Sequence, residues 1–178
     1  MITAENPSRL LASAAPPEDT DSGCQCLTFT SAGTLFAVEI SGIKEIIQYT
    51  RVTEVPMMPP QIRGVINLRG QVVPVVDLAV RFGREASALG RRSCVVILEL
   101  LEGGERYDIG VLVDSVSEVM EIAPEDMAPP PGFGTAIQPE FIRHMVRLED
   151  GFVIVLDVSR TFDARDMVAL AASVPEVA

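Results

Sequence analysis

Residues 63–78 read RGVINLRGQVVPVVDL, and this stretch decides how the rest of the chain is interpreted. Two largely apolar runs, Val65–Leu68 and Val72–Val76, flank a short polar break that contains Gly70. Such runs predict a β-hairpin, because glycine readily adopts the positive φ of tight hairpin turns. The second run is apolar throughout, which predicts that both faces of its strand are covered. Pro74 cannot donate a ladder hydrogen bond, so we expect this strand at a sheet edge or a bulge.

The hairpin has a counterpart later in the chain. Residues 143–158, RHMVRLEDGFVIVLDV, align with it without a gap, so that Asp77 corresponds to Asp157. Segments 35–46 and 108–119 form a second similar pair, in which Glu45 corresponds to Glu118. The sequence therefore predicts an internal duplication.

Short strands separated by Gly and Pro turns predict an all-β fold. Besides the central hairpin, strands are expected at 26–30, 34–40, 45–50, 93–100, 107–113, 116–122, 141–148 and 152–158. The chain of 178 residues is long enough for one sizeable core, or for two small barrels that share one. One helical turn is expected at 78–82, and the longest helix at 164–172. We expect a flexible arm over 1–23, lobes over about 24–85 and 92–163 divided by the polar connection 84–92, and a C-terminal helix and tail over 164–178. Exchange of strands between the lobes would blur that division.

Composition argues against several functional classes. The net charge of −11 disfavours binding to nucleic acid or to anionic lipid surfaces, both of which require Lys and Arg patches. No apolar run approaches the roughly 18 residues of a membrane span, and we expect a cytosolic protein. The three cysteines, Cys24, Cys26 and Cys94, are interpreted as free thiols. His144 is the only histidine, which excludes a His-rich metal site.

The sequence offers little support for catalysis. Asp77 and Asp157 could be a carboxylate pair, but each closes a strand just before a helical turn, where Asp commonly caps backbone amides. Glu45 and its equivalent Glu118 lie between apolar neighbours, which fits either a half-buried strand with solvent-facing charges or a partner surface. Arg69 lies on the hairpin turn, where a rigid guanidinium can bind a carboxylate, and we expect both Arg69 and Glu45 to be exposed. Residue chemistry alone therefore reaches a duplicated β protein that binds partners.

From Cys26 to Phe162 the chain resembles the CheW family of bacterial chemotaxis coupling proteins. The resemblance rests on the following motifs: Ile43–Ile46, Gly64–Gly70, Val73–Leu78, Val111–Val116, Pro129–Pro131 and Leu156–Val158. It implies two five-stranded SH3-like β-barrels within a CheW-like domain over 24–163. It also implies a non-catalytic adaptor that needs no cofactor and no metal.

The resemblance implies two partners, the tips of methyl-accepting chemoreceptors and the regulatory domain of the chemotaxis histidine kinase. It further implies a chain that is monomeric when alone, does not insert into the membrane, and is recruited from the cytoplasm to receptor arrays. Carried over by motif, the residues at or near the receptor groove are Ile43, Glu45, Gly64, Arg69, Gly110, Val116 and Val119. The residues of the kinase-facing loop are Met127, Pro131 and Phe133.

Two positions depart from the family pattern. Ala128 stands where some relatives carry a basic residue, and Arg143–His144 stands where a Gly is common. The alternative function within signalling is a variant coupling protein of a non-flagellar array, serving surface motility or gene regulation. A binder of proline-rich peptides is disfavoured, because such sites need exposed aromatic ladders and the chain has no Trp and only two Tyr.

Overall fold

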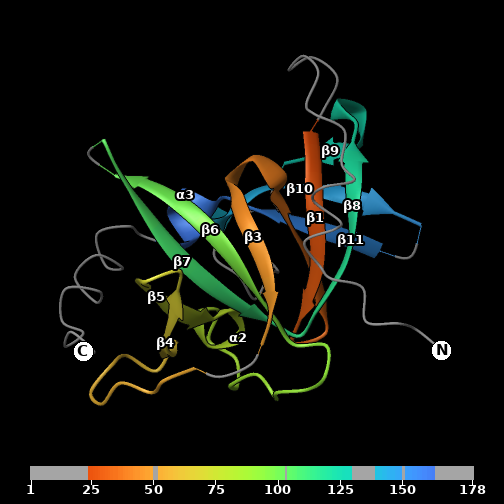
Figure 1. The fold of residues 1–178 in the computed structure, drawn as a ribbon. Helices are drawn as coiled ribbons and strands as arrows, with labels where there is room; N and C mark the ends of the chain where they lie inside the picture. The colour runs from red at the N-terminus through yellow and green to blue at the C-terminus, as the bar shows by residue number, and fades with distance from the viewer. Residues whose placement is uncertain (1–23, 50–51, 103, 130–138, 150, 163–178) are drawn as a thin grey trace.

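The computed structural model describes residues 24–49, 52–102, 104–129, 139–149 and 151–162, and within them the fold is all-β with two sheets (Figure 1). The first sheet has the order β8 (Ser115–Ile122), β1 (Cys24–Ser31), β2 (Thr34–Glu39), β11 (Gly151–Leu156), β10 (Ile142–Leu148) and β9 (Met127–Ala128). The second has the order β3 (Ile43–Gln48), β6 (Cys94–Glu102), β7 (Glu105–Val113), β5 (Gln71–Asp77) and β4 (Ile62–Leu68).

Each sheet takes strands from both halves of the chain. In the first sheet β2 pairs in parallel with β11, and in the second β5 pairs in parallel with β7. The lobes expected over about 24–85 and 92–163 therefore do not coincide with the sheets, because strands are exchanged between them. In the first sheet β1 pairs with β8 of the second half, and in the second sheet β6 pairs with β3 of the first half.

Strand registers confirm the duplication. The pair Val75↔Gly110 and the pair Val155↔Ala37 occupy equivalent places under the two alignments that the sequence shows. The edge pairings agree too, because Ile46↔Val96 in one sheet corresponds to Val119↔Leu27 in the other. Each of these edge pairings also contains a β-bulge at the equivalent place.

Both sheets curl toward closure, which fits SH3-like barrels. After edge strand β3 the chain crosses to the opposite edge, where Thr53 bridges Val65 of β4. After edge strand β8 it crosses in the same way through the 3-10 turn η3 (Pro124–Asp126) to β9, which pairs with β10. The sequence interpretation missed β9, and this two-residue strand gives the first sheet six strands rather than five.

Three apolar clusters hold the fold together. One lies on each sheet, around Val153 and Val155 in the first and around Val73 and Val75 in the second. The third is built by residues of both sheets, including Phe29, Phe36, Ile46, Val96 and Val111. Burying large side chains contributes roughly 1.5–3 kcal/mol each, so this shared cluster ties the two sheets into one body.

The sequence predicted β5 at a sheet edge or a bulge. The edge position is wrong, because β5 lies between β7 and β4, whereas the β4–β5 pairing does contain a bulge, between Ile62 and Gly64. The pairing of β5 with β7 begins only at Val75, one residue after Pro74, so the missing amide hydrogen falls outside the parallel ladder. The short helices α2 (Leu78–Arg81) and α3 (Val158–Thr161) follow the two aspartates as expected. Two other 3-10 turns, η2 (Ile40–Gly42) and η4 (Pro139–Phe141), are also present. The arm at 1–23 and the helix expected at 164–172 lie outside the described residues.

Candidate functional site

Glu45 and Arg69 form an ion pair on the outer face of the second sheet. Glu45 comes from edge strand β3 and Arg69 from the turn between β4 and β5, and their Oε2 and Nη2 atoms are 2.8 Å apart. The Arg69 side chain is 76% exposed and that of Glu45 only 15%. Arg69 thus agrees with the expectation of exposure, whereas Glu45 is half-buried beneath it. A single carboxylate oxygen occupies only part of the hydrogen-bonding capacity of a guanidinium. Arg69 can therefore still bind a second carboxylate.

The backbone at Arg69 favours a functional explanation for this residue. Arg69 and Gly70 both have positive φ, 53° and 86°, the pattern of a type I′ hairpin turn. Turn chemistry prefers Asn, Asp or Gly at the first of these positions, because an L side chain there costs about 1–2 kcal/mol. The Asn67 carboxamide oxygen accepts a hydrogen bond from the Gly70 amide and supports the turn. The equivalent of Arg69 in the second half is Glu149, so this cation appears in only one of two equivalent places.

Three half-buried apolar residues lie on the edge strands, and we call them with Glu45 the β3–β8 surface: Ile43, Glu45, Val116 and Val119. Ile43 is on β3, and Val116 and Val119 are on β8. All three pack against the cluster that both sheets share. Cys94, at the start of β6, lies between the two strands, because it pairs in register with Gln48 of β3 and with Val113, which precedes the start of β8 by two residues. Burial raises the pKa of the Cys94 thiol, so the thiol stays protonated at neutral pH.

Gly64 and Gly110 are buried, so they shape the site through packing. A Cβ at Gly64 would lie 2.2 Å from the Thr53 carbonyl oxygen, and the residue has a φ of 150°. A Cβ at Gly110 would lie 2.6 Å from Val95 Cγ1. Direct contact of either glycine with a partner stays a prediction.

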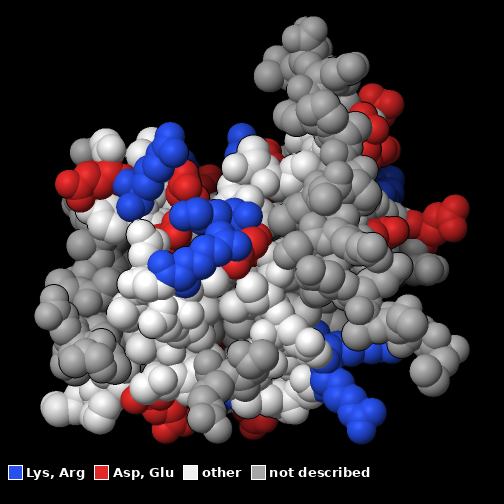
Figure 2. Space-filling model, viewed as in Figure 1, with Lys and Arg blue, Asp and Glu red and all other residues white. Residues whose placement is uncertain are grey.

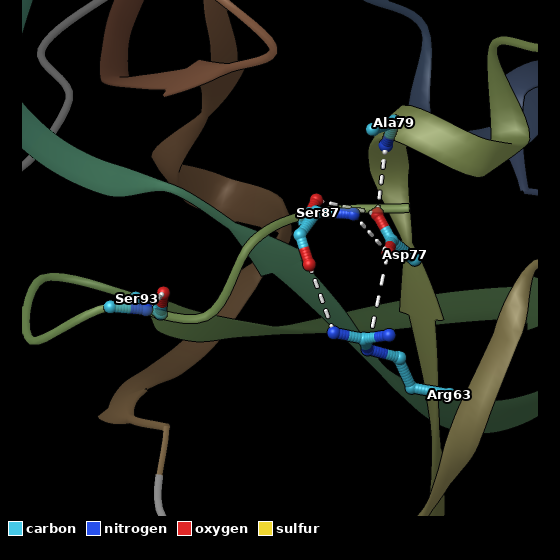
Figure 3. Close-up of polar contacts among 6 residues, drawn as sticks. Arg63, Asp77, Ala79, Ser87 and Ser93 are labelled. Carbon is cyan, nitrogen blue, oxygen red and sulfur yellow. Dashed lines mark hydrogen bonds and ion pairs between the residues drawn. The ribbon is translucent and has the colours of Figure 1, made fainter. Parts of the chain in front are cut away.

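Asp77 is the most heavily bonded polar side chain in the described core (Figure 3). It is fully buried, and it accepts hydrogen bonds from the Ala79 amide, the Ser87 amide and the Ser87 hydroxyl. Arg63 approaches it with Nε at 3.9 Å and donates from Nη2 to the Ser87 carbonyl at 3.0 Å. The prediction that Asp77 caps a helical turn is confirmed, and the side chain also fixes the segment 84–92.

The equivalent aspartate in the second half is held less firmly. Asp157 accepts one backbone hydrogen bond, from the Arg160 amide at 3.2 Å, and its side chain is 29% exposed. It lines an open pocket together with Glu39 and Arg143. Arg143, the equivalent of Arg63, pairs instead with Glu39 at 3.3 Å. Asp77 and Asp157 bind separate partners, so they do not form the carboxylate pair that the sequence left open.

The second departure from the family pattern, His144, is half-buried on β10. Burial lowers the pKa of His144, and the neighbouring Arg143 adds to this shift. Its Nε2 atom is buried and has no hydrogen-bond partner among the described residues. A neutral imidazole is therefore the form that the folded state favours.

The kinase-facing loop is only partly described. Met127 lies on β9 and pairs with Val146, and Ala128 pairs with Met145. Pro131 and Phe133 lie outside the described residues. Within the described ranges, no group of three or more His, Cys, Asp or Glu side chains could hold a metal ion. No helix in the same ranges is long and apolar enough to cross a membrane.

Comparison with known proteins shows the family to which the chain belongs. The family model of the CheW-like domain matches residues 25–166. The chain belongs to the CheW-like family. It is 30% identical over 145 residues to the chemotaxis protein CheW of Klebsiella aerogenes, covering 82% of this chain and 85% of that protein. It is 29% identical to the chemotaxis protein CheW of Treponema pallidum, covering 85% and 89% of the two chains.

A solved CheW structure has the same fold. The crystal structure of the scaffolding protein TtCheW from Thermoanaerobacter tengcongensis matches with a TM-score of 0.70 and 30% identity, covering 79% of this chain and 93% of that one. A shorter match joins the chain to Protein PilI of Pseudomonas aeruginosa, with 30% identity over 49% of this chain and 47% of that protein. The CheW-like fold expected from the motifs is thus confirmed.

The sequence motifs singled out Glu45, Arg69 and the β8 valines, but they missed three residues that hold other parts of the fold. Cys94 pairs with the end of β3 and the end of β7, and Ser87 and Arg63 complete the Asp77 cluster. A buried thiol at the first residue of a strand gives no sequence signal of its own. Arg63 could have been found from the repeat, because Arg143 stands at the equivalent position.

Proposed function

We propose that this protein is a non-catalytic adaptor that couples the tips of methyl-accepting chemoreceptors to the regulatory domain of a chemotaxis histidine kinase. Membership in the CheW-like family supports the adaptor function. The observation that carries the receptor half is the Glu45–Arg69 ion pair, which is held on a strained turn beside half-buried Ile43. The proposal places the protein at membrane-associated receptor arrays.

The β3–β8 surface suits a helical hairpin tip. Apolar knobs of a helix can pack on Ile43, Val116 and Val119, which keep part of their surface in solvent. Charges beside such a contact fix its register and speed the encounter. Arg69, three-quarters exposed, can serve as a charged anchor on this side of the sheet. The glycines Gly64 and Gly110 hold the strands beneath it.

The kinase half of the proposal uses different residues. Barrel-on-barrel packing needs exposed apolar groups, and Val72 and Phe152 are 42% and 52% exposed at equivalent places just after the two hairpin turns. The loop of Met127, Pro131 and Phe133 is a further candidate contact. We therefore expect kinase and receptor to be held at the same time.

The test measures receptor binding by Arg69→Glu and Glu45→Lys variants with a cytoplasmic receptor fragment, by co-sedimentation. Both variants should fold, because an ion pair that is open to solvent on its Arg69 side contributes only about 0–1 kcal/mol, and both should lose receptor binding. Arg106→Glu is the matched control: Arg106 is 75% exposed and pairs with Glu99 on the same sheet. If Arg69→Glu binds the receptor as the control does, the site assignment is wrong.

The double variant Glu45→Arg/Arg69→Glu separates two explanations. It restores an ion pair inside the protein with the charges exchanged. If Arg69 contacts the receptor directly, the exchange leaves binding weak; recovery of binding would show that the pair matters only for holding the turn.

The alternative is a variant coupling protein of a non-flagellar array. The partial similarity to Protein PilI, a relative that is not named for chemotaxis, keeps this function in view. Affinity capture from the native host, with identification of the retained kinase and receptors, distinguishes the two. Retention of a kinase other than the flagellar one would favour the alternative.

A further inference from the structure

Arg91 and Arg92 form a local concentration of positive charge on a chain whose net charge is −11. They end the connection 84–92 that leads into β6, and both are exposed. Six other described cations pair with acidic side chains, namely Lys44, Arg63, Arg69, Arg106, Arg143 and Arg160. Neither guanidinium of Arg91 or Arg92 has an ion pair or hydrogen bond with any described residue.

Backbone contacts place these two arginines at one end of the β3–β8 surface. Gln48, the last residue of β3, donates from Nε2 to the Arg91 carbonyl at 3.3 Å. The Cys94 thiol donates to the Arg92 carbonyl at 3.3 Å, and Cys94 pairs in register with Val113, which precedes the start of β8 by two residues. The pair of arginines therefore lies where the end of β3 meets the start of β8.

The connection that carries them is anchored at both ends. Ser87 is bound to the buried Asp77 (Figure 3). The Ser93 hydroxyl accepts a hydrogen bond from the Gly90 amide. The Tyr49 amide in turn donates to the Ser93 carbonyl at 2.9 Å. A charged group on a fixed backbone loses less conformational freedom on binding than one on a loose loop. The structure thus presents, from a segment whose backbone is held in place, two guanidiniums that have no partner among the described residues.

The surroundings of these arginines differ from those of the Glu45–Arg69 end. Over β3, β6 and β7 the basic and acidic side chains are interleaved, whereas a separate basic patch stands beside the connection into β6 at the lower right (Figure 2). The interleaved charges are the pairs Lys44–Asp108, Glu45–Arg69 and Glu99–Arg106. Of these two regions, only the second carries positive charge that no described acid neutralises.

We infer that Arg91 and Arg92 bind carboxylates on the receptor helix that docks on the β3–β8 surface, and that they set its direction and register. This inference rests on the proposed function. An acidic helix is repelled by a chain of this net charge except where cations gather, so its acidic residues are drawn to this end. Arginine suits the task because its planar fork binds a carboxylate through two hydrogen bonds.

The spacing on β3 predicts where the carboxylates lie on the partner. Glu45 and Gln48 are three residues apart, which corresponds to about 10 Å along a strand. An α-helix rises about 5.4 Å per turn, so the acidic residues should lie about two turns from the residue that meets Arg69. A helix docked in the opposite direction would present its carboxylates to the Glu45–Arg69 pair, where a single cation stands beside an acid, and would be disfavoured against the end that carries two arginines.

The experiment compares Arg91→Glu/Arg92→Glu with Arg147→Glu/Arg160→Glu. The second double variant changes the net charge by the same amount at exposed positions on β10 and α3. Calorimetry with the cytoplasmic hairpin fragment of a chemoreceptor from the same organism is done at about 50 mM and about 500 mM salt, where screening differs strongly. We expect the first variant to bind about tenfold more weakly at low salt, with the difference shrinking at high salt, and the control to stay within about twofold.

A charge exchange on the receptor gives a second readout. A Lys in place of an acidic residue about two turns from the Arg69 contact should restore binding to the Arg91→Glu/Arg92→Glu variant. If the unchanged protein binds the receptor and both double variants bind equally well, the inference is wrong while the proposed function stands. If the unchanged protein does not bind the receptor, the proposed function fails and this inference fails with it.

Vesicles that contain anionic lipid serve as the competing probe. Loss of vesicle binding in Arg91→Glu/Arg92→Glu, with receptor affinity unchanged, would assign the patch to a lipid surface and overturn the inference. Thermal melts of both double variants accompany every measurement, and equal melting temperatures show that the substitutions act on binding.

Discussion

Replacing Asp77 by Ala should destabilise the protein far more than the same change at its repeat equivalent Asp157. Asp77 is fully buried and accepts three hydrogen bonds, two of them from Ser87. Removing it deletes a helix cap and leaves Arg63 without a carboxylate in a partly buried site. Loss of one partner of a buried charge pair costs about 3–5 kcal/mol, and loss of a cap alone about 1 kcal/mol.

Asp157 is a matched control that the chain itself provides. It precedes a helical turn with nearly the same backbone angles, φ −85° and ψ 105° against φ −81° and ψ 111° at Asp77. Its side chain, however, is 29% exposed and makes one capping hydrogen bond. We therefore expect Asp157→Ala to cost only about 1 kcal/mol.

Urea unfolding followed by circular dichroism measures both costs, with the slope of the transition as a check on two-state behaviour. Asp77→Asn is included because a domain of ordinary stability, about 5–15 kcal/mol, can lose its fold to the larger change. The amide keeps one acceptor oxygen but points a donor at the Ser87 donors, so its cost should fall between the two alanine variants. Equal costs at Asp77 and Asp157 would refute the argument that burial and the Ser87 bonds set the difference.

Two further predictions concern packing and pH. Gly110→Ala should destabilise the fold by about 1–3 kcal/mol, because the added methyl group overpacks against Val95. Adding Val95→Cys should recover part of this loss, because the equivalent pair in the other sheet is Ala37 with Cys26. If urea unfolding shows that the costs of the two substitutions simply add, the packing argument is wrong. His144 has a folded-state pKa below its unfolded value of about 6.5, so the unfolded chain binds the proton first and stability should fall as pH drops below about 6.5, levelling off below the folded pKa. His144→Gln should lose this part of the pH dependence between pH 8 and pH 5.5, and an unchanged slope would show that other groups cause it.

The sequence predicted every long strand to within a few residues, because Val- and Ile-rich runs separated by Gly and Pro carry a strong local signal. It also predicted the hairpin turn at Gly70 and the caps at Asp77 and Asp157. Pro74 led to the wrong expectation of an edge strand. A proline can lie on an inner strand of a sheet at a position before the pairing with one neighbour begins, and here the pairing of β5 with β7 begins at Val75. The two-residue strand β9 was too short to give a pattern.

By itself the sequence determined the strands, the duplication and the motif residues Glu45 and Arg69, because these depend on local preference and on spacing along the chain. The tertiary structure decided which strands pair. Alternating and apolar runs predict a strand but do not name its neighbour, so β1 could pair with β8 of the other half without any change in pattern. The ion pair between Glu45 and Arg69, and the position of Arg91 beside the end of β3, follow from that pairing. They join residues distant in sequence, and only the closed sheet brings such residues together.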